Sequence, residues 1–439
     1  IIGAGPAGLS CAFYLAEKGY KPVVFEKNER PGGMLTYGIP SFKLQKDVIE
    51  AEVEIIRLMG AEFRYGVEVG RDVTLDELRA QGFKAFYVAI GCQGGRLAGI
   101  PGEDAEDVTV AVDFLREVNS GKVDALPGRT IVVGGGNVAI DVARNACRLG
   151  SEHVEMFCLE SEAQMPASEE ERREAIEDGA HISCGWGPKE VHLDESGRVC
   201  GITFKRCTRV FDDEGRFAPE YDENDLRRVD ADRVVMSIGQ SIVWGDLLAG
   251  SKVELGRGQG ALADPQTYQT AEPDIFVGGD VYTGPSFAID AIAAGHEAAV
   301  SIHRFVQPGS TLTIGRNQRR YTALDRDDVV LESYDNASRE VAHVDCEREK
   351  AAPFSEYVET FTEEQVRAET ARCLGCGASI VDPNKCIGCG LCTTKCAFDA
   401  IHLDRDRPEC STMVKYEQKL PSLGKYALKR AIKIKFGRK

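Results

Sequence analysis

Residues 1–27, IIGAGPAGLSCAFYLAEKGYKPVVFEK, decide the fold. They contain a short apolar strand, a G-x-G-x-x-G motif, a helix-like stretch and a second strand that ends at an acid, Glu26. Gly3 permits the tight turn from strand to helix, Gly5 lets a pyrophosphate approach the backbone, and Gly8 allows the helix to pack on the strand. The carboxylate of Glu26 can accept hydrogen bonds from a ribose diol. This order predicts a Rossmann-like fold that binds a dinucleotide.

A second stretch repeats the same order. A strand at residues 130–133 is followed by GGGNVA at residues 134–139, an accepted G-x-G-x-x-A variant of the motif, and then by a helix-like stretch. The next strand, HVEMFCLE, ends at Glu160. Two such folds in one chain predict one flavin nucleotide and one nicotinamide nucleotide. A degenerate second fold that binds no nucleotide is the alternative.

Composition and charge narrow the class of protein. The 439 residues are 43% hydrophobic and 28% charged, which is typical of a globular protein with more than one domain. We find no run of 18 apolar residues that would predict a transmembrane helix. The net charge of −17 argues against nucleic acid as the main partner. Only two residues precede the first glycine, so we expect the sequence to begin inside a strand, with further residues upstream.

Six of the 15 cysteines lie within residues 372–396, RCLGCGASIVDPNKCIGCGLCTTKC. The last four have the C-x2-C-x2-C-x3-C spacing of bacterial ferredoxins, and clustered C-x-x-C units without a signal peptide favour metal sites in a reducing cytoplasm. A zinc ribbon is the alternative, but four thiols within eleven residues suit a cubane better. The predicted metal ligands are Cys373, Cys376, Cys386, Cys389, Cys392 and Cys396.

The spacing also predicts how these thiols are shared. In two-cluster ferredoxins the fourth cysteine of the run serves the other cluster. We therefore expect the first three cysteines of the run to hold one [4Fe–4S] cluster, and Cys396 to join Cys373 and Cys376 around a second. Two clusters need eight ligands. Either Cys346, Cys410 or a non-cysteine ligand completes the set, or only one cluster forms.

The ordered motifs of residues 1–306 resemble a known family. GAGPAGL, FEK, GGMLTYGIPSFKL, GGGNVAIDVAR, MPAS and DIFVGGDVYTGPSFAIDAIAAG are similar to the glutamate synthase small subunit. The same module occurs in dihydropyrimidine dehydrogenase and in the large subunit of NADH-dependent ferredoxin:NADP oxidoreductases. The resemblance implies that the first fold binds FAD and that the nicotinamide domain is inserted in it.

We therefore expect an α/β protein with two Rossmann-like dinucleotide-binding domains and a small C-terminal ferredoxin-like iron–sulfur domain. The expected parts are an FAD-binding domain at 1–110 and 265–306, an NAD(H)-binding domain at 111–264, a linker or arm at 307–360, the ferredoxin-like domain at 361–410 and a basic tail at 411–439.

The motifs and the resemblance together identify cofactor-binding residues. Asp280 would bind the flavin ribityl chain or the pyrophosphate, and a helix starting near Ser286 would point its positive end at the flavin ring. The candidates for FAD are Gly3, Gly5, Pro6, Ala7, Gly8, Glu26, Lys27, Gly33, Met34, Gly91, Gly279, Asp280 and Ser286. The candidates for NAD(H) are Gly134, Gly136, Asn137, Val138, Glu160 and Gly239.

Leu159 and Glu160 stand where NADPH-using members of this family carry an arginine pair. A carboxylate repels a 2′-phosphate and accepts hydrogen bonds from a ribose diol, so we predict NADH as the nucleotide. In the alternative, Glu160 points to solvent and a basic residue such as Arg172 or Arg173 contacts the phosphate.

The predicted function is electron transfer between NADH, FAD and the clusters, to or from a partner subunit or a ferredoxin. An electron-bifurcating complex is one form that this function can take. The alternatives are a glutamate synthase-type small subunit and a cluster-bearing scaffold with an idle nucleotide site. Hydride transfer needs no side-chain acid or base, so we name no catalytic residue.

Residues 411–439 contain nine Lys or Arg and one acid, which predicts docking to an acidic partner in a hetero-oligomer, or else a solvated tail. The cysteines outside the cluster contain no C-x-x-C pair, so we expect small core residues and not a dithiol flavoenzyme. These are Cys11, Cys92, Cys147, Cys158, Cys184, Cys200 and Cys207.

Overall fold

The structure, a computed structural model, describes residues 1–314, 316, 337–373, 381, 386–395, 401–404 and 416–436. These residues form two compact units. The first unit contains the described residues within 1–336 and 341–362, and the second contains those within 337–340 and 363–439. Both nucleotide motifs lie in the first unit.

The first nucleotide motif follows the carboxyl end of Ile2, which lies in the middle of a parallel sheet. Ile2 bridges β1 (Val23–Glu26) and β3 (Phe86–Val88), so the first strand is reduced to a single residue. β2 (Glu62–Tyr65) pairs with β1, and β14 (Ile275–Val277) pairs with β3. The sheet therefore joins strands from the start of the chain to a strand that follows the second motif.

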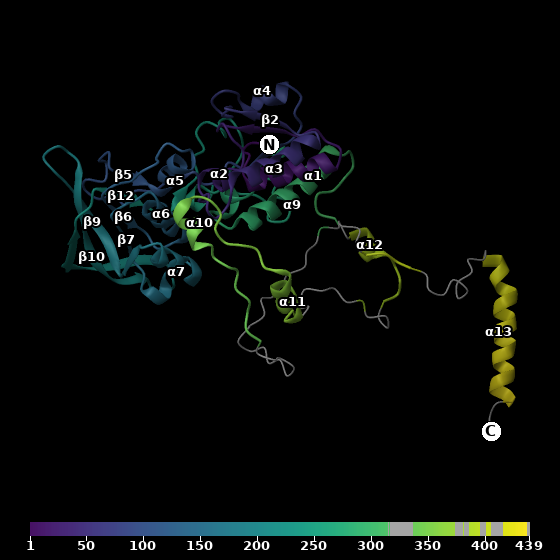
Figure 1. The fold of residues 1–439 in the computed structure, drawn as a ribbon. Helices are drawn as coiled ribbons and strands as arrows, with labels where there is room; N and C mark the ends of the chain where they lie inside the picture. Colours follow the sequence, from purple (N-terminus) through teal and green to yellow (C-terminus); the bar gives the residue numbers. More distant parts are fainter. Residues whose placement is uncertain are drawn as a thin grey trace. The chain divides into compact units, whose positions relative to one another are not determined.

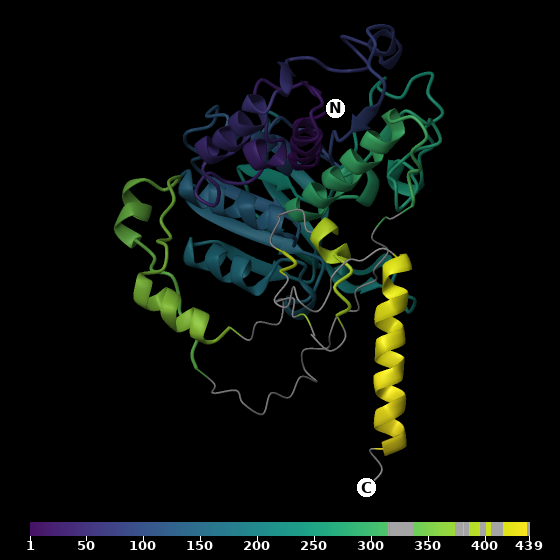
Figure 2. The same cartoon turned by 90° about the vertical axis from the view of Figure 1, so that its right-hand side faces the viewer.

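Two helices cover this sheet and lie side by side in both views of the ribbon (Figure 1, Figure 2). They are α1 (Pro6–Glu17), which follows the first motif, and α9 (Ala288–Val306). Their backbones approach closely at Gly295, where a Cβ atom would lie 2.2 Å from the carbonyl oxygen of Ala7. The close approach explains the small residues of both helices and places the start of α9 beside the first motif.

The second motif lies at the carboxyl end of the central strand of a five-stranded parallel sheet. Its strand order is β5 (Val108–Val110), β12 (Arg233–Met236), β6 (Arg129–Val133), β7 (His153–Cys158) and β8 (His181–Cys184). The middle strands β12, β6 and β7 are mostly apolar and buried because helices and a second sheet cover both faces. The covering helices are α5 (Ala111–Asn119), α6 (Asn137–Arg148) and α7 (Glu169–Glu177).

A three-stranded antiparallel sheet packs beside the five-stranded one. It consists of β9 (Trp186–Leu193), β10 (Val199–Phe211) and β11 (Phe217–Val229). Phe157 of β7 stacks on Phe204 of β10 with the ring centroids 3.9 Å apart. The antiparallel sheet thereby forms one wall of the cavity at the second motif.

Two features connect the two parallel sheets. The chain passes between them through β4 (Gly94–Gly95) and β13 (Gln240–Ser241), which pair antiparallel. Lys43 of the first fold donates to Asp141 of α6 at 2.6 Å and also pairs with Glu171 of α7. The side chain of Lys43 is 21% exposed, so this bridge is largely shielded from water.

Residues 341–362, which belong to the first unit, pack on the second fold. They include α10 (Cys346–Ala351). Arg144 of α6 donates to the hydroxyl of Tyr357 at 2.7 Å, and Arg148 pairs with Glu349 at 2.6 Å. Part of the segment expected as a linker is therefore held by buried arginines of the second fold.

The remaining short elements of the first unit are α2 (Met34–Tyr37), α3 (Lys46–Leu58), α4 (Leu75–Ala80), the 3₁₀ turns η1 (Glu162–Gln164) and η2 (Arg257–Gln259), and α8 (Asp280–Thr283). Most of them connect strands of the two parallel sheets, and α2 and α8 begin directly after glycines in the left-handed region, Gly33 and Gly279.

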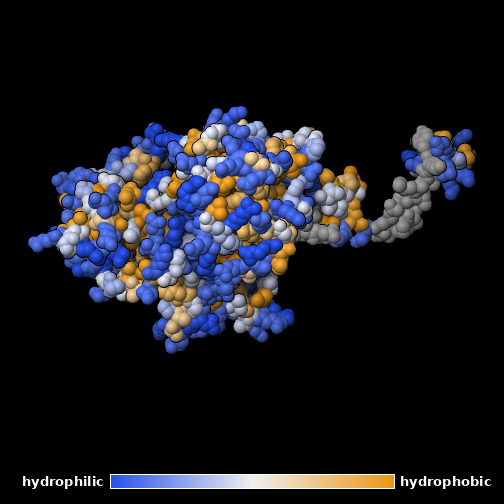
Figure 3. All heavy atoms as spheres, turned by 90° about the horizontal axis from the view of Figure 1, so that it is seen from above, coloured by the Kyte–Doolittle hydropathy of each residue, from blue (hydrophilic) through white to orange (hydrophobic). Residues whose placement is uncertain are grey.

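The second unit contains α11 (Glu363–Ala371), α12 (Leu391–Lys395) and α13 (Tyr416–Phe436). The apolar side chains of α13 are exposed, among them Leu420 at 60% and Ile434 at 65%. Figure 3 shows both hydrophilic and hydrophobic residues on this helix, at the right of the view. Within the described part of the chain, no helix combines the length and the apolar character that crossing a membrane requires.

Candidate functional site

The loop of the first motif can be built only from glycine at two positions. Gly3 has φ +103°, and a Cβ atom there would lie 2.4 Å from the carbonyl oxygen of Ala89. A Cβ atom at Gly8 would lie 1.9 Å from the carbonyl oxygen of Gly3. Both distances are shorter than non-bonded contacts between a carbon and an oxygen atom in proteins. They leave the N-terminus of α1 facing an open groove, which is the arrangement that favours a pyrophosphate.

Glu26 ends β1 directly beneath this loop and is only 3% exposed. Its Oε2 accepts a hydrogen bond from the backbone N–H of Ala4 at 2.8 Å. Its Oε1 accepts from the backbone and side-chain nitrogens of Asn28 at 2.9 and 2.7 Å. Both carboxylate oxygens are thus fixed in place, and each keeps room for a further donor such as a ribose hydroxyl.

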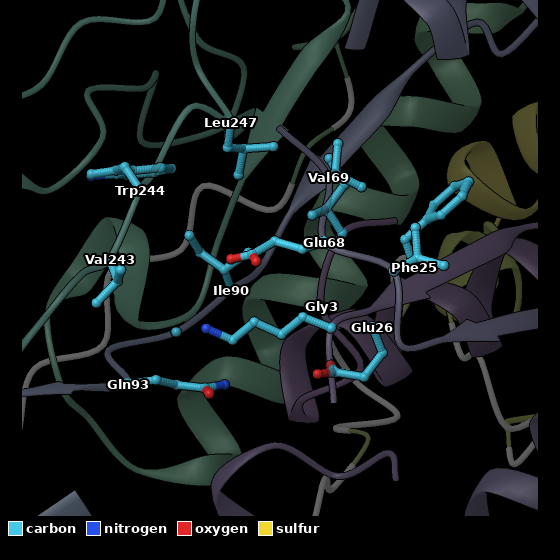
Figure 4. Close-up of a pocket in the computed structure, with 14 residues that line it drawn as sticks. Gly3, Phe25, Glu26, Glu68, Val69, Ile90, Gln93, Val243, Trp244 and Leu247 are labelled. Carbon is cyan, nitrogen blue, oxygen red and sulfur yellow. The ribbon is translucent and has the colours of Figure 1, made fainter. Parts of the chain in front are cut away.

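The carboxylate of Glu26 points into a small cavity, toward the side on which Gln93 lies (Figure 4). Trp244 and Leu247 close the opposite side, and Phe25 points away (Figure 4). This cavity of about 40 Å³ also contains Lys27. Its lining combines apolar side chains with two acids, Glu26 and Glu68, and such a mixture suits the adenosine end of a dinucleotide.

A second cavity of about 120 Å³ continues from the first. The two share Gly3, Glu26, Ile90, Gly91 and Gln93, so together they form one groove along the sheet edge. The structure brings most of the predicted FAD residues to this groove. Those that line its second part are Gly3, Gly5, Pro6, Ala7, Glu26, Gly33, Met34, Gly91, Gly279, Asp280 and Ser286. Gly8 lines neither part and serves the packing of the loop.

Asp280 lies in the floor of the groove, after β14 and at the start of α8. Burial raises the pKa of its carboxyl, and hydrogen bonds from the backbone N–H groups of Ser286 and Cys92 partly oppose this rise. A buried carboxylate is stabilised by further hydroxyl donors, which a ribityl chain carries. α9 begins at Ala288, two residues after the predicted start near Ser286.

The second motif opens on a much larger cavity of about 860 Å³. Gly134 has φ +141°, and a Cβ atom there would lie 2.2 Å from the carbonyl oxygen of Ser237. A Cβ atom at Gly136 would meet nothing within 4 Å, so its backbone faces open space. All six predicted NAD(H) residues line this cavity: Gly134, Gly136, Asn137, Val138, Glu160 and Gly239.

Glu160 lies two residues beyond β7 and is half-buried. Its Oε2 is 3.1 Å from the position that a Cβ atom at Gly135 would take, so the carboxylate lies against the glycine loop. Arg172 donates to the carbonyl oxygen of Glu162 and Arg173 pairs with Glu177. Neither arginine lines the cavity, which contains Arg96 and Lys205 as its basic residues.

The groove of the first fold and the cavity of the second fold meet between the two sheets. Pro285 lines the large cavity, and the next residue, Ser286, lines the groove. On the other side Gln93 lines the groove and Gly95 lines the cavity. Two nucleotides bound at these sites would therefore approach each other at residues 285 and 286, ahead of α9.

Four of the six predicted metal ligands lie in the described residues. Cys373, Cys386, Cys389 and Cys392 are exposed, whereas Cys376 and Cys396 lie outside the described residues. Gly388 and Gly390 separate the thiols with φ values of +66° and +75°, a conformation in which a loop can curl around a small group. Thiolates are the donors that iron–sulfur clusters take, so the donor set fits.

Within the same described ranges, no three His, Cys, Asp or Glu side chains gather as a ready metal site. Cys410 and the side chain of Cys346, the two candidates for a further ligand, also lie outside what the structure describes. The assignment of ligands to one or two clusters therefore stays a prediction.

Sequence reasoning missed one feature of the second site. Cys158 of β7 and Cys184 of β8 are register partners, and their sulfur atoms are 3.7 Å apart. Cys158 lines the large cavity. No local spacing could indicate this pair, because 26 residues separate the two cysteines and only the pairing of parallel strands brings them together.

Comparisons with known proteins agree with this architecture. Residues 1–295 match the family model of pyridine nucleotide-disulphide oxidoreductases, and residues 379–402 match the model of the 4Fe-4S binding domain. M. tuberculosis FprA in complex with NADPH, a solved structure, has a TM-score of 0.59 and 19% identity over 69% of this chain and 83% of that one. That likeness concerns the fold alone.

Two curated relatives are similar in sequence. The NADP(+)-dependent formate dehydrogenase subunit beta of Moorella thermoacetica is 35% identical over 395 residues, 86% of this chain and 54% of the relative. The glutamate synthase [NADPH] small chain of Escherichia coli (strain K12) is 36% identical over 326 residues, 70% of this chain and 68% of the relative. The chain thus spans about half the length of the first relative and two thirds of the second.

Proposed function

The chain belongs to the pyridine nucleotide-disulphide oxidoreductase family, and we propose that it transfers electrons between NADH, FAD and [4Fe–4S] clusters for a partner subunit or a ferredoxin. The observation that carries this proposal is that the groove of the first motif and the cavity of the second motif meet at Pro285 and Ser286. A hydride passes directly between two rings only when both are held in contact, and this junction is where the two folds would hold them.

The groove of the first fold is the FAD site in this proposal. A bound FAD would supply a ring system that can take a hydride from the nicotinamide and pass on its two electrons one at a time. The N-terminus of α1 holds the pyrophosphate, Glu26 binds the adenosine ribose, and Asp280 accepts a hydrogen bond from the ribityl chain. The positive end of α9 lies at the opposite end of the groove from Trp244 and favours negative charge on the ring system.

NADH is the proposed nucleotide because of Glu160. Its carboxylate lies beside Gly135, at the position of the acid that accepts hydrogen bonds from a ribose diol. Both relatives described above carry NADP(H) in their names, which points the other way. Lys205 is the basic side chain of the cavity wall on β10, but it pairs with Glu223 at 2.8 Å. Arg96 also lines the cavity, but a 2′-phosphate beside Glu160 would lie next to a negative charge.

The test is an anaerobic titration of the purified protein with NADH and, separately, with NADPH. We expect NADH to bleach the flavin absorbance and to produce the EPR signals of reduced clusters, with NADPH effective only at concentrations at least about tenfold higher. Glu160→Gln should reduce this preference, whereas Glu162→Gln, a change at an exposed neighbour, should not. Reduction by NADPH at lower concentrations than NADH would refute the specificity and leave the electron path intact.

The partner is the other part of the proposal. Both relatives are named as one chain of a larger enzyme, a subunit beta and a small chain. Exposed cysteines in the second unit and a basic helix α13 provide an exit for electrons and a surface for an acidic partner. Anaerobic co-purification should recover a second catalytic subunit, and a bifurcating complex would show coupled reduction of ferredoxin. A protein that purifies alone without flavin would instead support the scaffold alternative.

A further inference from the structure

The structure leaves one pair of reactive groups without a role. Cys158 and Cys184 face each other on adjacent parallel strands with their sulfur atoms 3.7 Å apart. Neighbouring strands are about 4.8 Å apart, which is within the range of Cα separations that a disulfide spans. The two thiols can therefore bond after a short movement of their side chains. Neither belongs to the predicted cluster ligands.

The pair lies between two cavities. Cys158 is 3% exposed and lines the large nucleotide cavity. Cys184 is half-buried and lines a separate cavity of about 310 Å³, next to Leu159 and Gly185. Burial raises the pKa of the Cys158 thiol well above its usual value, and the adjacent Cys184 raises it further. The more accessible Cys184 is thus the sulfur that an external reagent reaches first.

The geometry also couples the pair to the nucleotide loop. The Cys158 thiol donates weakly to the carbonyl oxygen of Glu160, with sulfur and oxygen 3.7 Å apart. The Cβ atom of Cys158 is 2.8 Å from the position that a Cβ atom at Gly135 would take. Gly185, the residue after Cys184, donates its N–H to the same Glu160 carbonyl at 2.9 Å. The side chain of Cys158 therefore contacts both the glycine loop and the backbone of Glu160, whereas the side chain of Cys184 is linked to them only through Cys158.

We propose that Cys158 and Cys184 form a reversible redox switch that weakens NADH binding when it is oxidised. This inference rests on the proposed function, because it assigns the large cavity to NADH. A disulfide brings the sulfur atoms to about 2.05 Å, removes the hydrogen bond from the Cys158 thiol to the Glu160 carbonyl and turns the Cys158 side chain, whose Cβ atom lies against Gly135. Glu160 and Gly135 then lose the positions that suit the ribose and the pyrophosphate.

The oxidant is a low-molecular-weight disulfide such as oxidised glutathione. The Cys184 thiolate attacks one glutathione sulfur, so a mixed disulfide forms while the glutathione disulfide breaks and one glutathione leaves. The Cys158 thiol then loses its proton to solvent and attacks the Cys184 sulfur, which releases the second glutathione. Two protein thiols are oxidised to one disulfide, and one oxidised glutathione is reduced to two glutathiones.

The experiment treats the full chain with oxidised glutathione under argon and then removes the reagent. Alkylation, non-reducing digestion and mass spectrometry should find the peptide of Cys158 linked to the peptide of Cys184. Titration with NADH should show binding at least about tenfold weaker than in the untreated protein. Dithiothreitol should restore it. A linkage of Cys184 to Cys207, which lines the same small cavity, would overturn the proposed pair.

Cysteine variants distinguish an effect of the Cys158–Cys184 disulfide from oxidation at other cysteines. Cys184→Ser should bind NADH normally before treatment and lose both the linkage and the change in affinity, and Cys184→Ala gives the same test if the serine variant misfolds. Cys200→Ser, a change at a half-buried cysteine that lines neither cavity, should retain both. A Cys158–Cys184 linkage with unchanged NADH affinity would refute the switch. Failure of the untreated protein to bind NADH would instead refute the proposed function, while the linkage would still test the pair.

Discussion

The two nucleotide folds of this chain share one motif and surround it differently. In the first fold the acid is buried, and three hydrogen bonds hold the carboxylate of Glu26. In the second fold Glu160 is half-buried, and its carboxylate accepts no hydrogen bond from the described residues. The last residue of the motif is Gly8 in the first fold, where a Cβ atom cannot fit, and Ala139 in the second.

The cavity beside the second motif is also larger and more open than the groove beside the first. The first fold closes on a narrow groove with parts of about 40 and 120 Å³, whereas the second opens on about 860 Å³. A rigid acid and a tight loop fit a cofactor that stays bound, since its site is organised in advance. An open cavity with an unconstrained acid fits a substrate that must enter and leave in each turnover. The same motif is therefore suited to a permanently bound cofactor in the first fold and to an exchanging nucleotide in the second.

The largest expected effect is that of Gly8→Ala, which disrupts the first nucleotide site. Gly8→Ala places a Cβ atom 1.9 Å from the carbonyl oxygen of Gly3, so α1 must move away from the loop. We expect a loss of about 3 kcal/mol in the free energy of unfolding, together with loss of FAD. Thermal unfolding and the flavin absorbance of the purified variant measure both. A variant that keeps its FAD and its melting temperature would contradict the tight loop.

A smaller effect is expected from Glu26→Gln. The amide must turn its NH₂ group toward Ala4 or toward Asn28, so at least one backbone or side-chain donor loses its acceptor. This should cost about 1–3 kcal/mol of stability and weaken FAD binding. Glu62→Gln, at an exposed acid of β2, serves as the control.

The matched change in the second site sharpens the comparison. Glu160→Gln should leave the melting temperature within about 1 °C, because none of the described residues donates a hydrogen bond to its carboxylate. Equal destabilisation by the two substitutions would show that the two acids are held alike.

Gly136→Ala should act on nucleotide binding alone and leave the stability unchanged. The new Cβ atom meets no protein atom within 4 Å and points into the cavity. We expect the variant to fold and to keep FAD, while NADH binds about tenfold more weakly because the methyl group occupies the space of the pyrophosphate. Stopped-flow reduction of the flavin at several NADH concentrations measures this change. Loss of FAD in this variant would contradict the separation of the two sites.

Much of both sites could be predicted from the sequence because the nucleotide motif is local. Strand, turn, helix and acid follow one another within about 30 residues, so their order determines how they fold together. Residues brought to the groove from distant segments, such as Gly33 and Asp280, were predicted only through the resemblance to a family.

Features that depend on packing between distant segments could not be predicted. The antiparallel sheet β9–β11, the bridge from Lys43 to Asp141 and the thiol pair Cys158–Cys184 each need the finished strand order. The predicted end of the second strand at Glu160 was two residues late, since β7 ends at Cys158 where its pairing with β8 ends.

The return of the chain to the first sheet has a consequence for synthesis. β3 ends at residue 88, but its neighbour β14 begins at residue 275. A ribosome releases all five strands of the second sheet, which lie between residues 108 and 236, before it reaches β14. The second fold can therefore form while the first still exposes the edge of β3 and the face of α1 that α9 will cover. The sheet that is begun first is thus completed after the strands of the second sheet, and a nascent chain of intermediate length exposes that surface.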